Sequence, residues 1–335
     1  MPSRALASPA TALPASAGGA PLPGRLRLRL LGIDAAEATF ARRGFAEADP
    51  AARARLEGAG LAFLVGYHAA LVWAGSAQLP ARLVGVPPER RGFAYEGAGM
   101  ALALLDALAP WGGGRLAAFL RGPGDRHAYM VHVGAGWALA RLRRRFDAVP
   151  RGMDPLLGWL AADGYGFHEG YFHPRRYAAG GAAPRRVSGY ARRAFDQGLG
   201  RSLWFVHGGD PAAVAVAIGR FPADRHPDLW SGAALACAYA GGADRGEAAA
   251  LAAAAGVHRP ALAQGAAFAA GARARAGNPA PHTDAACRAL CGAGADRAAR
   301  ACDAARQGLA PYGSLPAYEL WRLRIQQHFA PEVRG

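Results

Sequence analysis

The sequence contains no lysine, and all 39 of its basic residues are arginine. With 24 acidic residues, this gives a formal net charge of +15 at pH 7. Two explanations stay open. Abundant Arg, Ala, Gly and Pro is what a GC-rich genome encodes, whereas a functional charge would attract an acidic protein, an anionic substrate or nucleic acid. Because the arginines are dispersed and no nucleic-acid-binding motif occurs, we expect an acidic protein partner and no nucleic acid.

The chain also lacks long apolar runs and paired cysteines. No stretch of roughly eighteen consecutive apolar residues occurs, so we expect no membrane span. Residues 1–24 are rich in Pro, Ala, Gly and Ser without the apolar centre of a secretory signal, which predicts a disordered tail. The four cysteines form no CxxC pair, so a zinc site is disfavoured and reduced, buried thiols in a cytoplasmic protein are expected.

What is present favours helices. Alanine is the best helix former and β-branched residues are sparse, so the composition predicts an all-α fold. Apolar spacing, capping residues and prolines place the helices in the following ranges: 51–76, 95–108, 127–146, 190–205, 211–218, 229–239 and 316–329. The segment RLRLRLL at 25–31 alternates like a strand, or else begins the first helix.

A glycine in similar sequence context returns about every 28 to 37 residues, a length typical of one helical hairpin in a repeat protein. Its positions are Gly66, Gly97, Gly134, Gly170, Gly198, Gly232 and Gly265. A helix without a Cβ at such a position lets the next helix backbone approach closely. Ordinary close packing in an irregular helical domain is the alternative explanation.

A longer similarity points to an internal duplication. The block 87–103 aligns with 222–238 without a gap, including Tyr95 with Trp230 and Gly97 with Gly232. We therefore predict a helical-repeat array of hairpins, of the α-solenoid or TPR-like kind, with halves at 25–180 and 181–335. The Pro-rich and Gly-rich stretch 174–186 is the expected connector, although the two halves could form one continuous domain.

The candidate site residues come from two sources. The segment 163–173 carries two carboxylates, two imidazoles and two phenols between glycines, and Asp163, His168, Glu169 and Glu96 are the candidate acid–base groups. The candidate ligand-binding residues lie at or near the recurring glycines: Tyr95, His132, Tyr165, Gln197, Trp230 and Gln264. If Glu96, His132, Glu169, Gln197, Ser231 and Gln264 are equivalent repeat positions, they line one groove. Hydrogen bonding between helices or exposure to solvent is the competing interpretation.

The sequence contains no motif that is typical of a metal site or a cofactor site. His168 and His173 are five residues apart, which places them on different sides of a helix, and no HExxH or ExxH motif occurs, so we expect no metal. No nucleophile elbow, phosphate loop or dinucleotide fingerprint occurs, so we expect no cofactor. Whether the protein is an enzyme stays open at this point.

Five segments together resemble the UnbL-type accessory family, a domain of unknown function encoded in gene clusters for enediyne polyketide antibiotics. They are RGFAYEGAGMALALLD, DGYGFHEGYF, FDQGLGRSLWF, FPADRHPDLWSGAALACAYAGG and LAQGAAFAAGARARAG. The resemblance covers residue 25 to the C terminus. It implies a pathway and brings no catalytic residues with it.

That context implies two functions of different class. In one, the protein acts on or binds a hydrophobic, polyene-derived intermediate while the enediyne core forms or matures, beside the polyketide synthase or another pathway enzyme. In the other, it is a non-catalytic helical scaffold that binds pathway enzymes or an acidic carrier domain.

Overall fold

The computed structural model describes residues 21–109, 113–310 and 315–330, and in these ranges the protein is all-α. The seventeen α-helices of the described residues are α1 Leu22–Leu31, α2 Phe40–Arg43, α3 Pro50–Trp73, α4 Gln78–Val84, α5 Pro88–Leu108, α6 Arg115–Leu120, α7 Ala128–Arg141, α8 Leu160–Phe172, α9 Pro174–Tyr177, α10 Ala191–Val206, α11 Pro211–Ile218, α12 His226–Ala240, α13 Arg245–Ala254, α14 Arg259–Ala276, α15 Pro281–Leu290, α16 Ala295–Ala305 and α17 Ala317–Phe329. Five short 3₁₀ segments join them: η1 Ala35–Ala38, η2 Asp125–His127, η3 Leu157–Trp159, η4 Ala223–Arg225 and η5 Gly256–His258. The all-α prediction is confirmed.

Local sequence explains several helix boundaries. Asp49 and Asp210 each accept hydrogen bonds from first-turn amides of a helix that begins with proline, α3 and α11 respectively. Asp244 and Glu247 form a capping box at the start of α13. Gly277 ends α14 in the left-handed conformation that glycine adopts without strain.

Three predicted boundaries were wrong. The alternating segment 25–31 is helical, and its helix begins at Leu22, inside the predicted tail; the rest of that tail, residues 1–20, lies outside the described residues. Helix α5 begins at Pro88, because proline is tolerated in a first turn. Helix α7 stops at Arg141: Arg143 has a left-handed φ of 52°, and Phe146 instead pairs with Val187 as an isolated β-bridge.

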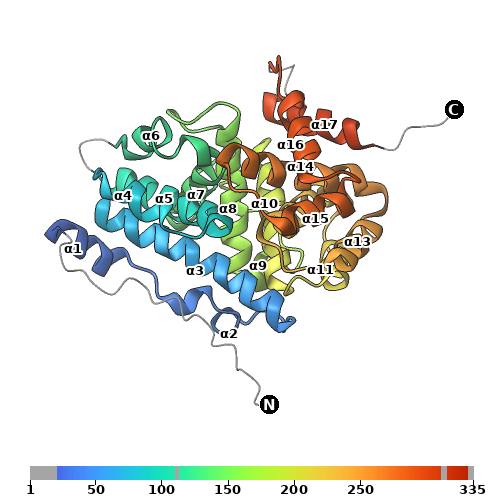
Figure 1. Ribbon diagram of the computed structural model, residues 1–335, viewed down its shortest axis with the longest axis horizontal. Coiled ribbons are helices and arrows are strands. Elements are labelled where there is room, and N and C mark those ends of the chain that lie inside the picture. The colour runs from blue at the N-terminus through green and yellow to red at the C-terminus, as the bar shows by residue number, and fades with distance from the viewer. Residues whose placement is uncertain (1–20, 110–112, 311–314, 331–335) are drawn as a thin grey trace, which may run out of the picture.

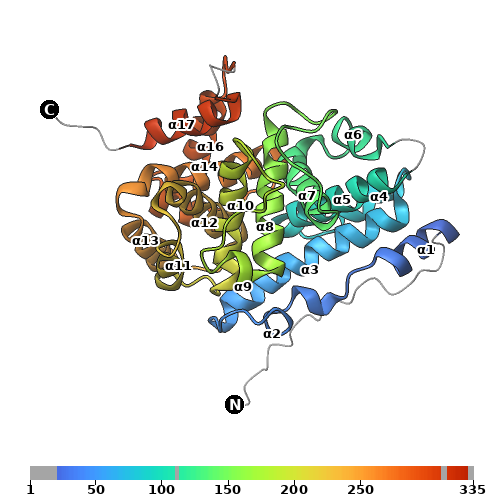
Figure 2. The ribbon, with the colours of Figure 1, turned by 180° about the vertical axis from the view of Figure 1, so that it is seen from behind.

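Seven long helices pack in chain order. Each of α3, α5, α7, α8, α10, α12 and α14 lies against the next, and α8 sits near the middle of the molecule in both views (Figures 1 and 2). The last helix, α17, covers α14 and buries Tyr318, Trp321 and Ile325. On the opposite side, α1 and α2 belong to an N-terminal arm that runs along the outside of α3 (Figure 1).

Glycines let these helices touch backbone to backbone. A Cβ added to any of six glycines would lie 2.0 Å or less from a carbonyl oxygen of the preceding helix: Gly97 on Phe63, Gly134 on Glu96, Gly164 on Val133, Gly198 on Asp163, Gly232 on Gln197 and Gly265 on Ser231. A second set faces the following helix: Gly66 on Ala94, Gly99 on Val131, Gly136 on Ala161, Gly166 on Phe195 and Gly200 on Leu229. Close approach of helix backbones is therefore confirmed at six of the seven recurring glycines; Gly170 lies instead against the side chain of Ser202. The repeat array, its duplication and its two halves stay predictions.

One of these helices, α3, is long and apolar enough to cross a membrane when judged by length and composition alone. In the window that passes this test, 56% of the residues are buried inside the protein. Core helices of soluble proteins pass the same test, so this feature is weak evidence for a span.

The glycine contacts predict a position-dependent loss of stability. Gly136→Ala would place a methyl group 2.0 Å from the Ala161 carbonyl oxygen, so α7 and α8 must separate. We expect the free energy of unfolding to fall by about 1–3 kcal/mol. Gly219→Ala is the matched control, because its added Cβ meets nothing closer than 3.6 Å. Equal urea denaturation midpoints for the two variants would contradict the close-approach explanation.

Candidate functional site

A pocket in which aromatic side chains are the largest group of lining residues lies between α3, α5, α7, α8 and α10. Its seven aromatic side chains are Phe63, Phe93, Trp137, Phe167, Tyr171, Phe172 and Phe205. Three charged residues also line it: Glu96, Arg201 and Glu37. The cavity volume is about 50 Å³, counted as the space open to the centre of a water-sized sphere. The lining is thus apolar except for a few charged groups, which is the usual make-up of a small-molecule site.

Glu96 is the buried carboxyl of this pocket, with 2% of its surface exposed. Trp137 Nε1 donates a hydrogen bond of 3.1 Å to Glu96 Oε1, and Arg201 Nη2 lies 3.8 Å from the same oxygen. Burial raises the pKa of Glu96 to about 7, although the Arg201 charge acts in the opposite direction. Glu96 can therefore hold or release a proton near neutral pH, as an acid–base group must.

Arg201 joins two carboxyl groups in the core. Its Nη1 donates to Asp163 Oδ1 at 2.5 Å, and its guanidinium carbon lies 4.8 Å from the Phe167 ring centroid, a cation–π contact. Burial lowers the pKa of Arg201, but Asp163 and Glu96 outweigh this effect and the net shift is upward. The guanidinium therefore stays charged beside the pocket.

From Asp163 a chain of hydrogen bonds, here called the buried polar chain, crosses α8, α10, α12, α14 and α17. Gln197 Nε2 donates to Asp163 Oδ2 at 2.8 Å, and Ser231 Oγ lies 3.4 Å from Gln197 Oε1 and 2.9 Å from Gln264 Oε1. Arg322 Nε donates to that Gln264 oxygen at 3.2 Å. Arg322 also pairs with Asp228 and Glu319, so the chain ends in a buried ion-pair cluster.

The buried polar chain follows the glycine contacts but corrects the predicted register. The residues just before the six contact glycines are Glu96, Val133, Asp163, Gln197, Ser231 and Gln264. Asp163 takes the place predicted for Glu169, because Gly164 rather than Gly170 touches the preceding helix backbone. Val133 likewise takes the place of His132. The competing interpretation, hydrogen bonding between helices, holds for Gln197, Ser231 and Gln264.

None of the six predicted ligand-binding residues lines the pocket, and apart from Gln197 and Gln264 of the buried polar chain they lie as follows. Tyr95 stacks on His127 with ring centroids 3.8 Å apart. His132 Nδ1 lies 2.7 Å from the Ala128 oxygen, and its Nε2 accepts a hydrogen bond of 3.4 Å from the Asp154 amide. Tyr165 is buried against Phe195, and its hydroxyl has no hydrogen-bond partner. Trp230 is buried and is not among the pocket-lining residues.

His168 and Glu169 stand behind the pocket wall. The His168 ring lies 5.8 Å from Trp137 and 4.8 Å from Phe172, centroid to centroid. Its Nδ1 is 3.7 Å from Glu169 Oε1, and burial lowers the pKa of this imidazole. Of the four acid–base candidates, only Glu96 lines the pocket itself, and Asp163 reaches it through Arg201.

Sequence reasoning missed Arg201 and most of the aromatic wall. One signal was available for Arg201: it lies four residues after Gln197, so both side chains fall on the same face of α10. The wall residues Phe63 and Phe205 come from helices far apart in sequence, and no local motif joins them.

The N-terminal arm covers this pocket with Ile33, Glu37 and Ala38. Arg43 holds the arm in place: its Nη1 pairs with Glu37 at 2.5 Å, and its Nη2 donates to the Phe172 carbonyl oxygen at 2.9 Å. Its guanidinium carbon also lies 4.7 Å from the Phe172 ring centroid. Tyr171 of the aromatic wall adds two contacts: its hydroxyl donates to the Glu37 carbonyl oxygen at 3.3 Å, and its ring lies 4.9 Å from that of Phe45, centroid to centroid.

In the part of the chain that the structure describes, no three His, Cys, Asp or Glu side chains are grouped so that they could hold a metal ion. The fold and the pocket define an all-α protein with an aromatic cavity beside a buried acid–arginine cluster. The chain belongs to a family described as protein of unknown function (DUF1702), which matches residues 22–329. No curated protein and no solved structure matches the chain.

The pKa of Glu96 predicts a pH-dependent stability difference. A folded pKa of about 7, raised from 4.5, means that the stabilisation by neutral Glu96 is complete below about pH 4.5 and is lost as the pH rises through about 7. Relative to Glu96→Gln, the wild type should therefore lose free energy of unfolding between about pH 5 and 8.

Urea denaturation of both proteins across this range measures the difference. Asp196, whose pKa burial raises to about 6, is present in both proteins, so its effect cancels. Parallel stability curves would contradict a neutral Glu96.

Proposed function

We propose that this protein is an accessory protein of enediyne antibiotic biosynthesis that binds a polyene-derived intermediate in the aromatic pocket, in the cytoplasm. The observation that carries the proposal is the wall of seven aromatic side chains around the buried Glu96. Flat aromatic faces suit a flat conjugated chain, and the resemblance of the five sequence segments supplies the pathway.

Glu96 supports a chemical role in that pocket. A carboxyl group with a pKa of about 7 can give a proton to one carbon of a conjugated chain and, once ionised, take one back from another. Such a step moves double bonds without oxidation or reduction, so it needs no cofactor. Arg201 would stabilise the ionised Glu96 between the two transfers.

Ligand entry requires movement. About 50 Å³ of space holds a few water molecules, whereas an elongated polyene is several times larger. The segment at Ile33, Glu37 and Ala38 covers the pocket, and its displacement would open the site. We therefore include an open state of the arm in the proposal.

The predicted helical-repeat array is also part of the proposal. We propose that the helices α3 to α14 form a duplicated helical-repeat array. The support is the regular contact in which a glycine of each long helix meets the carbonyl oxygen of a residue on the preceding one.

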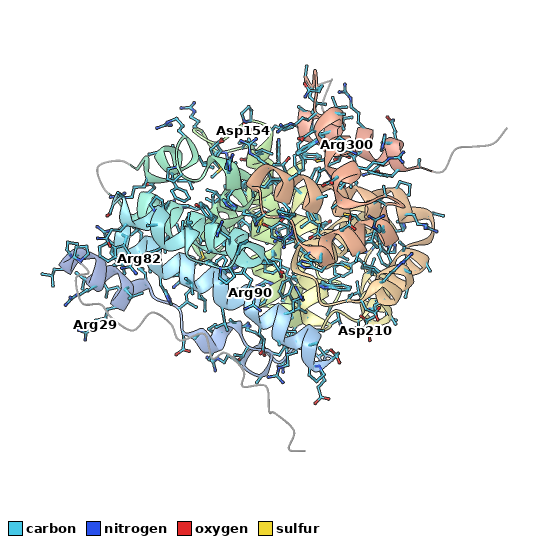
Figure 3. All side chains as sticks on the ribbon, in the orientation of Figure 1. Arg29, Arg82, Arg90, Asp154, Asp210 and Arg300 are labelled. Carbon is cyan, nitrogen blue, oxygen red and sulfur yellow. The ribbon has the colours of Figure 1, made fainter. Side chains whose placement is uncertain are left out.

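A scaffold function is the second candidate. It is favoured by the net charge of +15 and by solvent-exposed arginines such as Arg82, Arg90 and Arg300, labelled on different helices in Figure 3. Such a surface suits an acidic carrier domain or pathway enzyme. In that case the pocket residues would be dispensable for product formation.

Complementation of a deletion strain with point variants separates the two candidates. Glu96→Gln should lower turnover of the polyene intermediate by roughly 10²–10⁴-fold, because it removes the proton that Glu96 transfers. His168→Ala should retain turnover, since His168 does not line the pocket. Glu47→Gln, an exposed carboxyl in the arm, is the matched control. Metabolite analysis measures product in the strain, and purified protein measures turnover and polyene binding.

Unchanged turnover in Glu96→Gln would contradict the catalytic proposal. Full complementation by that variant, together with capture of a pathway enzyme, would favour the scaffold.

A further inference from the structure

Helix α1 exposes a stripe of leucines, here called the leucine stripe, made of Leu22, Leu26 and Leu30. These side chains are 80%, 56% and 71% exposed, respectively. Their spacing of four residues places them along one face of the helix. The opposite face contacts α3, where Gly24 lies against the Val72 backbone: an added Cβ would be 2.5 Å from the Val72 oxygen. The helix is therefore apolar on two faces, and only one of them is covered by the described residues.

Arginines border the leucine stripe on both sides. Arg25 and Arg29 follow one edge and are exposed. Arg27 lies on the other edge, and its Nη1 reaches the Leu71 carbonyl oxygen at 3.5 Å. Helix α1 contains no acidic residue, so every charged side chain of the helix itself is positive. Its surroundings favour an anionic partner with an apolar layer beneath its charges.

We propose that α1 docks in the plane of an anionic lipid membrane, with the leucine stripe in the acyl region and the arginines among the phosphates. An anionic lipid surface matches both features, because its charged headgroups lie directly above the hydrocarbon layer. The position of α1 allows it: the helix lies at the outer edge of the molecule in both ribbon views (Figures 1 and 2). Among the described residues it packs mainly on α3, and none of them covers its outer leucines.

Docking at α1 would affect the aromatic pocket, because the chain continues from α1 directly into the segment that covers the pocket. The residues that follow α1 cover the aromatic pocket, beginning with Ile33, whose amide donates to His68 Nε2 at 3.2 Å. An apolar ligand dissolves in a bilayer, so the membrane could deliver it beside the covering arm. Docking itself does not rest on the proposed function, because the leucine stripe and its arginines are independent of the pocket.

Vesicle sedimentation of the full-length protein tests the docking. We expect binding to phosphatidylcholine vesicles that contain phosphatidylglycerol, weaker binding to phosphatidylcholine alone, and loss of binding as salt rises from roughly 0.1 M to 0.5 M. The double variant Leu26→Asp with Leu30→Asp should bind at least about tenfold more weakly. Val257→Asp is the matched control, since Val257 is 89% exposed on η5, outside the arm.

A second pair of variants tests the charges. Arg29→Gln should weaken binding about fivefold, whereas Arg300→Gln on α16 should leave it unchanged. Figure 3 shows these two arginines far apart, Arg29 at the left edge and Arg300 at the upper right. Circular dichroism confirms that each variant is folded.

Three outcomes would overturn the docking proposal. The first is absence of vesicle binding by the wild type. The second is equal binding by the leucine variant and by Val257→Asp. The third is a dimer in light scattering that the leucine variant converts to a monomer, which would make the leucine stripe an interface between two copies. Glu96→Gln should bind vesicles like the wild type, so failure of docking and failure of the pocket proposal are distinguishable.

Discussion

The structure depends on direct contact between helix backbones at glycines. At Gly198, for example, an added Cβ would lie 1.7 Å from the Asp163 carbonyl oxygen, closer than non-bonded atoms can come. Contacts this close fix both the spacing and the register of neighbouring helices, because a shift of one residue would push a side chain into a backbone. They also decide which side chains point between helices, namely those next to the glycines.

This constraint explains why polar groups occupy the core. The residues before the contact glycines must lie between helices, and five of these six positions are polar: Glu96, Asp163, Gln197, Ser231 and Gln264. Buried polar groups require partners, and these find them in one another, in Arg201 and in Arg322. A buried ion pair contributes little net stability, since desolvation offsets the attraction. The arrangement instead determines the pKa of Glu96: burial and the nearby Asp163 charge raise it to about 7 against the opposing charge of Arg201.

The sequence allowed the helices, the close glycine contacts and Glu96 to be predicted, but not the register of every helix. In α8 glycine occurs at 164, 166 and 170, and periodicity alone cannot tell which of them meets the neighbouring backbone. Choosing Gly170 led to Glu169 instead of Asp163. Local sequence patterns could not predict the aromatic pocket, for a different reason. Its wall joins Phe63 of α3 to Phe205 of α10, and only the packing order of five helices brings these rings together.

The same packing limits how the pocket can open. Its walls are formed by helices α3, α5, α7, α8 and α10. Each of these helices is in close contact with its neighbour where a glycine meets a carbonyl oxygen. Separating them would therefore break a continuous close-packed interface. The covering residues Ile33, Glu37 and Ala38 belong to an arm that is held by the polar contacts of Arg43, by the buried rings of Phe40 and Phe45, and by one backbone hydrogen bond from Ala46 to Val206. None of these arm contacts is one of the glycine contacts that join the long helices. Movement of the arm would therefore open the pocket with less loss of helix packing, and the proposed ligand would then enter beside α1.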